Sequence, residues 1–348
     1  MKISCFSRWL GLLLAAAMLA GCAPQQPSAQ LYSATYLDVF DTVTTLKGPA
    51  ETEALFQELS DALHEELLYH HKLFDIYNEY DGMTNLKTVN DRAALAPVTV
   101  EPAILQLLLD CRSYYELTGG KVNAAMGSVL RLWHDARTAA ADDPESAALP
   151  DPEALREAAA HTDFDSVILD EEASTVFFTD PQLRLDVGAI AKGWTAQRVS
   201  RELPEGVLLS VGGNVLATGP KPDSGAPWVV AVQKPDLSAE GYLATVELDQ
   251  GSMVTSGDYQ RYFTVGDVRY HHIIDPDTRF PSRYWSSVTI RCEDSGLADA
   301  LSTALFVLDL EDGQALLEKT GAEALWLTPD GEIFASPGFT TRENIGKS

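Results

Sequence analysis

One short run of residues, LDVGAIAKGW (185–194), places an acid and a lysine on either side of a glycine. The apolar residues before Gly188 favour a strand that ends at the glycine, and the residues after it favour a helix. Asp186 would then lie at the end of the strand, with Lys192 about two helical turns further on. Packing alone requires neither charge, so their role depends on what else in the chain meets them.

A second acid lies in an otherwise apolar, helix-like segment, LADALSTALF (297–306). Burying an aspartate is costly unless a partner compensates its charge. Asp299 and Thr303 are four residues apart, so they share a helix face that presents a carboxylate and a hydroxyl. Both are hard oxygen ligands suited to Mg²⁺. The alternative is that Asp299 is a charge near a helix N-terminus, where the helix dipole stabilises it.

Three further stretches are more polar than packing requires. In SVGGN (210–214), two glycines follow a strand; they either let the backbone approach a ligand closely or simply form a tight turn. Asp258 lies in a polar cluster, TSGDY (255–259). His271 and His272 are adjacent in a strand-like run and point to opposite faces. One of them would be a proton carrier or a polar contact, and the alternative is a structural histidine.

The elements that would position these residues mix helices and hairpins. Leucines recur at every fourth position from Leu55 to Leu67, which predicts an amphipathic helix, and Glu101-Pro102 opens another helix. Strands are expected at 36–46, 167–169, 176–179, 183–187, 207–211, 228–232, 244–248 and 288–291. Hairpins are expected at 262–274 and 324–335, and residues 139–151 read as an acidic surface excursion. Hairpins mixed with packed helices predict one integrated α+β domain.

The N-terminus is typical of an exported protein. A basic start and a short apolar run end in LAGC (19–22), which predicts a signal peptide over residues 1–21, too short to span a bilayer. The same residues match a bacterial lipobox, so Cys22 would carry lipid and residues 22–35 would form a lipidated tether. The alternative is an ordinary signal peptide with an incidental cysteine. We expect a lipid-anchored protein on the extracytoplasmic face of the cell membrane, either periplasmic or on the outer surface of a single membrane.

Charge and cysteine content exclude other classes of protein. A formal net charge of −26 argues against nucleic acid as a partner, because phosphates require a basic face. An anionic ligand would have to be met locally by backbone N–H groups, a few cations or a metal ion. The mature chain keeps Cys111 and Cys292, which are too few and too distant to form a disulfide framework.

Taken in order, these segments resemble the ApbE family of FAD:protein FMN transferases. The resemblance extends from about residue 36 to 340, so that residues 36–348 would form an ApbE-type domain. The motifs that carry it are FDTVTTL (40–46), FDIYNEYDGMTNLKTVN (74–90), TGGKVNAAMGSVLRLW (118–133), LDVGAIAKGW (185–194), SVGGNVLATGPKP (210–222), TSGDYQRYF (255–263), HHIIDP (271–276) and LADALSTALF (297–306). The family resemblance implies mixed sheets and helices around a T-fold-like core, with FAD held in a cleft.

The resemblance also implies an activity. A threonine hydroxyl of a target protein would attack the FMN-side phosphorus of FAD; FMN would become bonded through a phosphoester, AMP would leave, and Mg²⁺ would be required. The partners would be exported redox proteins that carry a flavinylation threonine. Two alternatives use the same site: a Mg²⁺-dependent FAD pyrophosphatase that gives FMN and AMP, and a non-enzymatic FAD-binding lipoprotein.

The resemblance assigns roles to individual residues. Asp186 would bind the flavin and Lys192 would contact FAD. The other FAD contacts would be Phe40, Tyr77, Lys121, Val122, Asn123 and Ile273. Mg²⁺ would be held by the backbone carbonyl of Ala189 and by Asp299 and Thr303, with Ser302 adjacent. His272 would assist removal of the threonine proton, with Asp258 as a second candidate. On this interpretation, Asp299→Ala would abolish transfer and leave the fold mostly intact.

Overall fold

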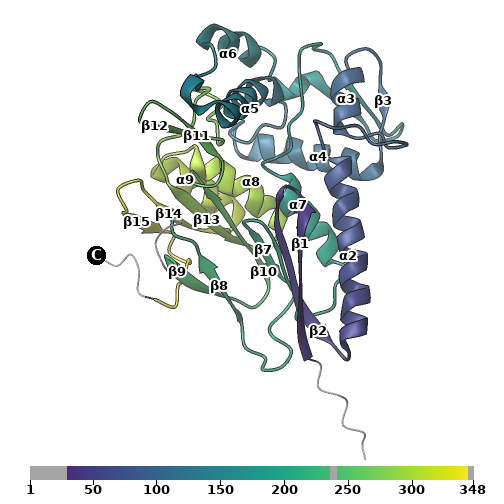
Figure 1. Cartoon of the computed structure of the whole chain (residues 1–348), viewed down its shortest axis with the longest axis vertical. Helices are drawn as coiled ribbons and strands as arrows, with labels where there is room; N and C mark the ends of the chain where they lie inside the picture. The colour runs from purple at the N-terminus through teal and green to yellow at the C-terminus, as the bar shows by residue number, and fades with distance from the viewer. Residues whose placement is uncertain (1–29, 236–240, 344–348) are drawn as a thin grey trace, which may run out of the picture.

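The computed structural model of the protein describes residues 30–235 and 241–343 (Figure 1). The predicted signal peptide and the start of the predicted tether, including Cys22, lie outside the described residues. Strand β1 begins at Gln30, so the part of the predicted tether from this residue onward belongs to a strand of the folded domain. Within the described ranges, no helix has the length and apolar character needed to cross a membrane.

The predicted α+β class is confirmed, whereas the T-fold-like core stays a prediction. In the described ranges the α-helices are α2 (Glu53–Leu73), α3 (Leu86–Arg92), α4 (Pro102–Leu117), α5 (Gly127–Asp142), α6 (Pro152–Ala159), α7 (Ala191–Ser200), α8 (Ser295–Phe306) and α9 (Leu310–Thr320), with 3₁₀ helices η1 (Pro144–Ser146) and η2 (Phe164–Ser166). The strands are β1 (Gln30–Val39), β2 (Thr42–Ala50), β3 (Val98–Thr99), β4 (Val167–Asp170), β5 (Thr175–Phe178), β6 (Leu208–Val211), β7 (Asn214–Ala217), β8 (Trp228–Val232), β9 (Ala244–Leu248), β10 (Gly251–Gly257), β11 (Tyr262–Val265), β12 (Val268–His271), β13 (Ser287–Cys292), β14 (Glu323–Leu327) and β15 (Ile333–Ala335).

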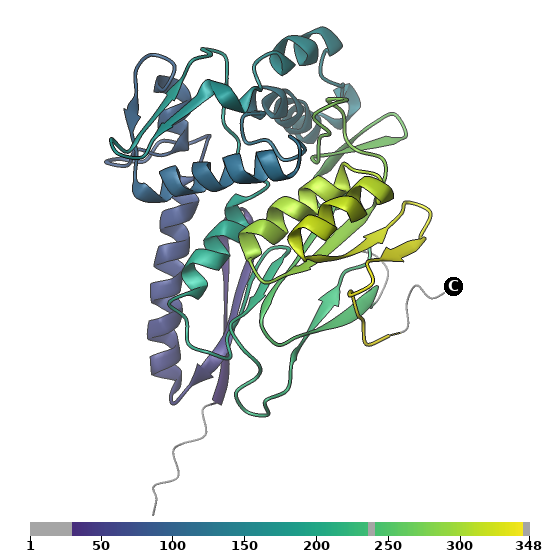
Figure 2. The ribbon, with the colours of Figure 1, turned by 180° about the vertical axis from the view of Figure 1, so that it is seen from behind.

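An eight-stranded sheet forms the centre of the molecule, in the order β1-β2-β6-β7-β10-β13-β14-β15. Every neighbouring pair in it is antiparallel. Helices α2, α7 and α8 pack against its strands, and Figure 2 shows α7, α8 and α9 in front of the sheet. The β8–β9 hairpin shares a separate apolar cluster with β7, β10 and β14. The central strands are therefore buried on both faces, which explains why their sequences are almost continuously apolar.

The second part of the molecule contains α3 to α6 and the three-stranded sheet β3-β5-β4, beyond one end of the large sheet (Figures 1 and 2). A single apolar core joins the two parts: it includes Leu108 and Phe178 from the smaller part and Leu301 and Trp326 from the larger part, all almost completely buried. The two parts of the described chain therefore share one apolar core.

The single strand predicted at 36–46 is wrong, because the chain reverses within it. Val39 pairs with Thr42, and the two residues between them, Phe40 and Asp41, form the turn of the β1–β2 hairpin with φ of 51° and 52°. Such turns normally carry Asn-Gly or Asp-Gly, because both residues need positive φ. The aromatic residue at this position hid the turn from sequence analysis.

The strand predicted at 183–187 is also absent; only an isolated bridge joins Arg184 to Met126. The segment is nevertheless extended, because the side-chain amide of Asn90 takes the place of a strand partner. Its Nδ2 donates to the carbonyl of Leu185 at 2.9 Å, and its Oδ1 accepts from the Leu185 N–H at 2.7 Å. The next N–H, that of Asp186, donates to the carbonyl of Ala124 at 2.8 Å.

Other predicted elements are confirmed. The leucine repeat lies in α2, Pro102 opens α4, and the two C-terminal hairpins are β11–β12 and β14–β15. The predicted surface excursion begins later than expected, because α5 continues to Asp142. The cysteines of the described residues, Cys111 and Cys292, are unpaired, as expected.

Candidate active site

The start of α7 meets α8 at Asp299. Gly193 is the third residue of α7. N–H groups in the first turn of a helix have no acceptor within the helix, and that of Gly193 donates to Oδ2 of Asp299 at 2.8 Å. A Cβ atom on residue 193 would lie 2.2 Å from the backbone oxygen of Ser295, so only glycine lets the two helices approach this closely. Asp299 is almost fully buried, with 3% of its surface exposed.

The contact between Gly193 and Asp299 shows which helix dipole stabilises the carboxylate of Asp299. The N-cap of its own helix, α8, is Asp294, whose Oδ1 accepts from the N–H of Leu297 at 2.8 Å. Asp299 instead caps the N-terminus of the neighbouring helix α7. A carboxylate there interacts favourably with the partial positive charge of the helix end. The alternative that a helix dipole stabilises the charge of Asp299 is therefore correct, but the helix is α7 and not α8, which contains Asp299.

Lys192 lies beside the same carboxylate. Its Nζ is 3.5 Å from Oδ2 of Asp299 and 3.4 Å from the carbonyl oxygen of Gly188. A cationic group is thus already accommodated between the loop before α7 and α8. In a regular helix the Gly193 N–H would donate to the carbonyl of Ala189. It donates to Asp299 instead, and within the described ranges no hydrogen bond ends on the Ala189 carbonyl.

These oxygen atoms fit a magnesium ion. Asp299 offers a carboxylate, Ala189 a carbonyl, and Thr303 a partly exposed hydroxyl one turn further along α8. Such hard donors, together with phosphate oxygens of a ligand, are what Mg²⁺ prefers. The hydroxyl of Ser302 is fully buried and already donates to the Asp299 carbonyl at 2.9 Å. In the part of the chain that the structure describes, no cluster of three or more His, Cys, Asp or Glu could hold a metal.

The two adjacent histidines have separate roles. His271 is structural: Nε2 donates to the carbonyl of Ser282 at 2.7 Å, and Nδ1 accepts from the Ile273 N–H at 3.2 Å. Burial lowers the pKa of His271 to about 4. His272 has a buried Nδ1 without a hydrogen-bond partner, and burial lowers its pKa to about 3. At neutral pH His272 is therefore uncharged.

Several cations surround His272. After burial, the charges of Arg261, Arg137 and Lys192 contribute to lowering its pKa. The backbone N–H of His272 donates to the carbonyl of Arg261 at 3.1 Å. In a chain with 51 acidic and 25 basic residues, such a group of cations marks a place for an anion. Arg137 and Arg261 were missed by sequence analysis, although Arg261 lies within the TSGDYQRYF motif and its type could have identified it.

Asp186 faces the same group. Burial raises the pKa of its carboxyl. Two effects act in the opposite direction: the Gly188 N–H donates to Oδ1 at 2.8 Å, and the charges of His134, Arg137 and Arg261 lie nearby. The structure therefore brings Asp186 and His272 to the same cations, as the predicted site requires.

Tyr77 joins this group through His134, another residue that sequence analysis missed. The two rings stack with centroids 4.6 Å apart, and the Tyr77 hydroxyl lies 3.2 Å from Nδ1 of His134. Nη2 of Arg137 is also 3.2 Å from this nitrogen. Burial and the charge of Asp186 raise the pKa of Tyr77 to about 12. Even so, 44% of Tyr77 is exposed, so its ring has a free surface near Asp186.

Phe40 occupies a strained turn. Its positive φ is unfavourable for a bulky side chain, and such conformations occur most often at functional sites. Its N–H donates to Nδ1 of His71 at 3.1 Å. The two glycines after β6 form the tight turn that was one of the two alternatives, and a Cβ atom on Gly212 would lie 2.7 Å from Oγ1 of Thr42. Gly212 thus packs against Thr42, which follows the Phe40 turn, whereas Gly213 lies against the backbone of Thr255 in β10.

Other predicted FAD contacts are engaged with the protein itself. Lys121 lies 2.5 Å from Oδ2 of Asp277 and 3.6 Å from Oδ1 of Asp275. Burial lowers the pKa of Lys121, but these carboxylates outweigh the effect and raise it. The Asn123 side chain donates to the Thr162 carbonyl and accepts from the Ala125 N–H, each at 2.8 Å. The side chains of Val122 and Ile273 are buried, with exposed fractions of 2% and 5%.

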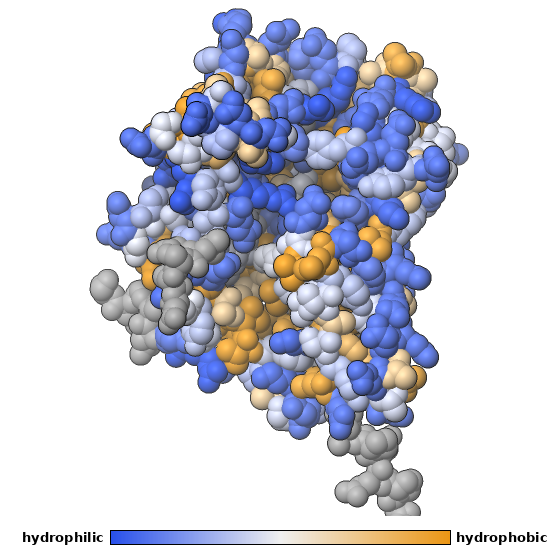
Figure 3. All heavy atoms as spheres, viewed as in Figure 1, coloured by the Kyte–Doolittle hydropathy of each residue, from blue (hydrophilic) through white to orange (hydrophobic). Residues whose placement is uncertain are grey.

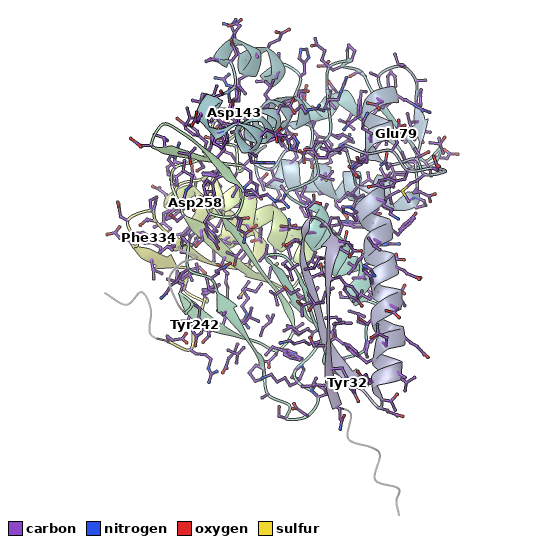
Figure 4. All side chains as sticks on the ribbon, in the orientation of Figure 1. Tyr32, Glu79, Asp143, Tyr242, Asp258 and Phe334 are labelled. Carbon is purple, nitrogen blue, oxygen red and sulfur yellow. The ribbon has the colours of Figure 1, made fainter. Side chains whose placement is uncertain are left out.

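Asp258, the second catalytic candidate, has different neighbours from His272. Burial raises its pKa, and the charges that oppose this are those of Arg269 and Arg283, not those of Arg137 or Lys192. Figure 4 shows Asp258 beside the β11–β12 hairpin, below Asp143 at the end of α5. Among the described residues, no hydrogen bond or ion pair joins Asp258 directly to Asp299, and its catalytic role stays a prediction.

The residues that do converge come from the loop before α7, from α5, from α8 and from the end of β12. The space-filling view in Figure 3 shows a recess near the middle of the face drawn there, between the two parts of the molecule. A neutral histidine, a group of cations and hard oxygen donors suit a phosphate-bearing ligand. Fold and site together define an α+β enzyme that acts on such a ligand.

Comparison with known proteins specifies the family. A profile of the ApbE family matches residues 33–326, and the chain belongs to this family. It is 33% identical to the FAD:protein FMN transferase of Treponema pallidum, over 99% of this chain and 98% of the relative.

Two solved structures have the same fold. The ApbE protein of Thermotoga maritima superposes with a TM-score of 0.78 at 30% identity, over 88% of this chain and 97% of that chain. The flavin transferase ApbE of Vibrio cholerae superposes with a TM-score of 0.75 at 26% identity, over 89% and 98%.

Proposed function

We propose that the protein transfers FMN from FAD to a threonine hydroxyl of a target protein, with Mg²⁺ bound and AMP released. Relatives that match 99% and 78% of this chain are named FAD:protein FMN transferases. The observation that carries the proposal is the arrangement at Asp299: its buried carboxylate caps α7 and lies beside Lys192, whose ammonium group also contacts the Gly188 carbonyl in the loop before α7. A fold that only stored a flavin would not need these groups at a diphosphate.

The chemistry follows from the groups present. The threonine oxygen forms a bond to the FMN-side phosphorus, and the bond from this phosphorus to the bridging oxygen breaks, so AMP leaves with that oxygen. His272 is neutral and has an unpartnered Nδ1, so it can accept the threonine proton. Arg137, Arg261 and Lys192 offset the charge of the diphosphate, which is the main requirement in phosphoryl transfer.

Asp299, the Ala189 carbonyl and Thr303 would hold the magnesium ion. When bound, the ion would neutralise charge on the diphosphate oxygens. Ser302 would position this set, since its hydroxyl bonds to Ser256 at 2.8 Å as well as to the Asp299 carbonyl. On the flavin side, Asp186, Tyr77 and the turn at Phe40 would contact the ring system, with the remaining contacts at Lys121, Val122, Asn123 and Ile273.

We further propose that Cys22 is lipidated and that the domain works on the extracytoplasmic face of the membrane, on exported redox proteins. The LAGC sequence supports this. Growth of the source cells with radiolabelled palmitate tests it: labelling of the full chain that Cys22→Ser removes is expected, and labelling that persists in the variant would contradict it.

The activity is tested with the full chain in detergent, FAD, MgCl₂ and a panel of exported redox domains from the same organism. Flavin fluorescence in a denaturing gel detects covalent FMN, and chromatography detects AMP. A domain that is labelled, and whose threonine-to-valine variant is not, supports the proposal. AMP and free FMN without any acceptor would favour a pyrophosphatase, and tight FAD binding without AMP would favour a storage protein.

A further inference from the structure

A cavity of about 510 Å³ lies beside the site, between α5 and the β11–β12 hairpin. One wall contains Arg137 and Ala141 of α5 together with Glu145 of η1, and the opposite wall contains Tyr262 and Thr264 of β11. Figures 1 and 2 both show α5 and the hairpin side by side. None of the predicted residues lines this cavity.

The wall formed by the hairpin is the edge of a strand. Three consecutive residues, 262–264, border the cavity. Side chains alternate between the two faces of a strand, so a cavity that touches all three lies along the strand edge rather than over one face. No residue of β12 borders the cavity. β11 pairs only with β12, so in the described part of the chain its other side has no strand neighbour. Alternate N–H and C=O groups of β11 therefore point away from β12, as at any free edge.

The cavity leads to the reacting end of the site. Arg137 lines the cavity, and its charge also acts on His272 and Asp186. Tyr262 is paired with His271, and the residue before it, Arg261, accepts the backbone N–H of His272 at 3.1 Å. A chain running along β11 would therefore reach His272 at the Tyr262 end.

Tyr262 is held in place on this edge. The guanidinium of Arg269 lies 4.2 Å from the centre of its ring, which is favourable for a cation over an aromatic face. Tyr262 remains 41% exposed, so it offers a fixed apolar surface beside the free main-chain groups. Main-chain bonding at a strand edge gives affinity to many sequences, and fixed side chains add selectivity.

We propose that the acceptor protein docks here, as an extended segment that adds a third strand to β11 and brings its hydroxyl to His272. This inference rests on the proposed function and specifies how its protein substrate is bound. The other ligand that the cavity could take is the adenosine half of FAD, and the experiment below distinguishes the two.

The test compares two substitutions on α5. Ala141 is exposed and lines the cavity, whereas Ala139 is exposed and does not. Ala141→Trp fills the cavity, and Ala139→Trp adds the same side chain to the same helix outside it. The substrate is the exported redox domain that the wild-type chain labels in the assay described above. We expect Ala141→Trp to lower kcat/KM for this domain about tenfold through KM, and Ala139→Trp to leave it unchanged.

FAD affinity, measured by flavin fluorescence, should be the same in both variants. A second measurement is hydrogen exchange with the threonine-to-valine form of the domain, which should protect the amides of residues 262–266 in the wild-type chain. Unchanged kcat/KM in Ala141→Trp, or no protection, would overturn the docking proposal, and weaker FAD binding would assign the cavity to the nucleotide. Failure of the proposed function would look different, because the wild-type chain would then label no domain.

Discussion

Replacing Asp299 tests two roles of one side chain. Its Oδ2 accepts the Gly193 N–H at 2.8 Å, which caps α7, and its charge faces Lys192 and the proposed metal position. Asparagine keeps an oxygen that can accept the N–H but removes the charge. Alanine removes both. The pair of variants therefore separates the cap from the charge.

The expected loss of stability follows from these contacts. A hydrogen bond to a charged group contributes about 1.5–3 kcal/mol, and a charge at a helix N-terminus typically about 0.3–1 kcal/mol. Asp299→Ala should therefore lower the unfolding free energy by about 2–4 kcal/mol, and Asp299→Asn by about 1 kcal/mol. For a domain of roughly 300 residues, the alanine variant should melt about 3–6 °C lower. The structure thus revises the expectation from sequence that alanine would leave the fold mostly intact.

Transfer should be lost in both variants, because both remove the charge. Urea unfolding measures stability, and covalent FMN formation measures transfer. Asp294 provides the matched control: its carboxylate caps a helix in the same way, at 2.8 Å, but lies outside the proposed metal position. Asp294→Asn and Asp294→Ala should reduce stability and keep transfer per folded molecule.

Two results would refute this reasoning. Transfer at the wild-type rate by Asp299→Asn would show that the charge is not needed, and the proposed metal position would be wrong. An unchanged melting temperature in Asp299→Ala would show that the cap contributes nothing to stability.

The remaining predictions concern three other residues of the site. Gly193→Ala places a Cβ 2.2 Å from the oxygen of Ser295 and should cost about 1–3 kcal/mol in urea unfolding. Gly313→Ala in α9, whose Cβ would meet nothing closer than 3.5 Å, is the control, and equal stability of the two variants would contradict the prediction. Because burial raises the pKa of Asp186, the folded state loses stability as the pH rises above the ordinary value of 3.8, and this cost is present at pH 7. Asp186→Asn should therefore gain about 1 kcal/mol in urea unfolding at pH 7 and weaken FAD binding; a loss of stability would count against this explanation. Because its pKa is about 3, His272 stays neutral between pH 7 and 5. Protonation of His272 should therefore not slow transfer over this range. A fall in the transfer rate centred near pH 6.5 that is absent in His272→Gln would disprove this. His272→Gln should reduce kcat about a hundredfold with little change in FAD affinity.

Residue type alone predicted some properties of individual residues that the structure bears out. An aspartate in an apolar helix needs a partner, and Asp299 has one; adjacent histidines point to opposite faces, and only His272 keeps an unpartnered nitrogen. The α+β class and both C-terminal hairpins also followed from local patterns. What these patterns could not show was which residues meet across the fold.

The wrong predictions have the same cause: the residues involved are held by contacts with distant parts of the chain. The turn at Phe40 lacks the residues that normally adopt positive φ, because surrounding packing sets its conformation. The segment at Leu185 looked like a strand because its backbone is extended, but an asparagine side chain replaces the neighbouring strand. Arg137 and His134 lie on α5 without a local signal, and only the contact with Tyr77 shows that they belong to the site.

The bond between Asn90 and Leu185 has a consequence for how the molecule matures. The two residues are 95 positions apart, and α8 with Asp299 lies more than a hundred positions further along the chain. Ordering such distant partners requires closing long loops, which is slow compared with forming local contacts. A chain whose synthesis has not reached α8 lacks Asp299 and Thr303, so the proposed metal position can form only after most of the chain has been made.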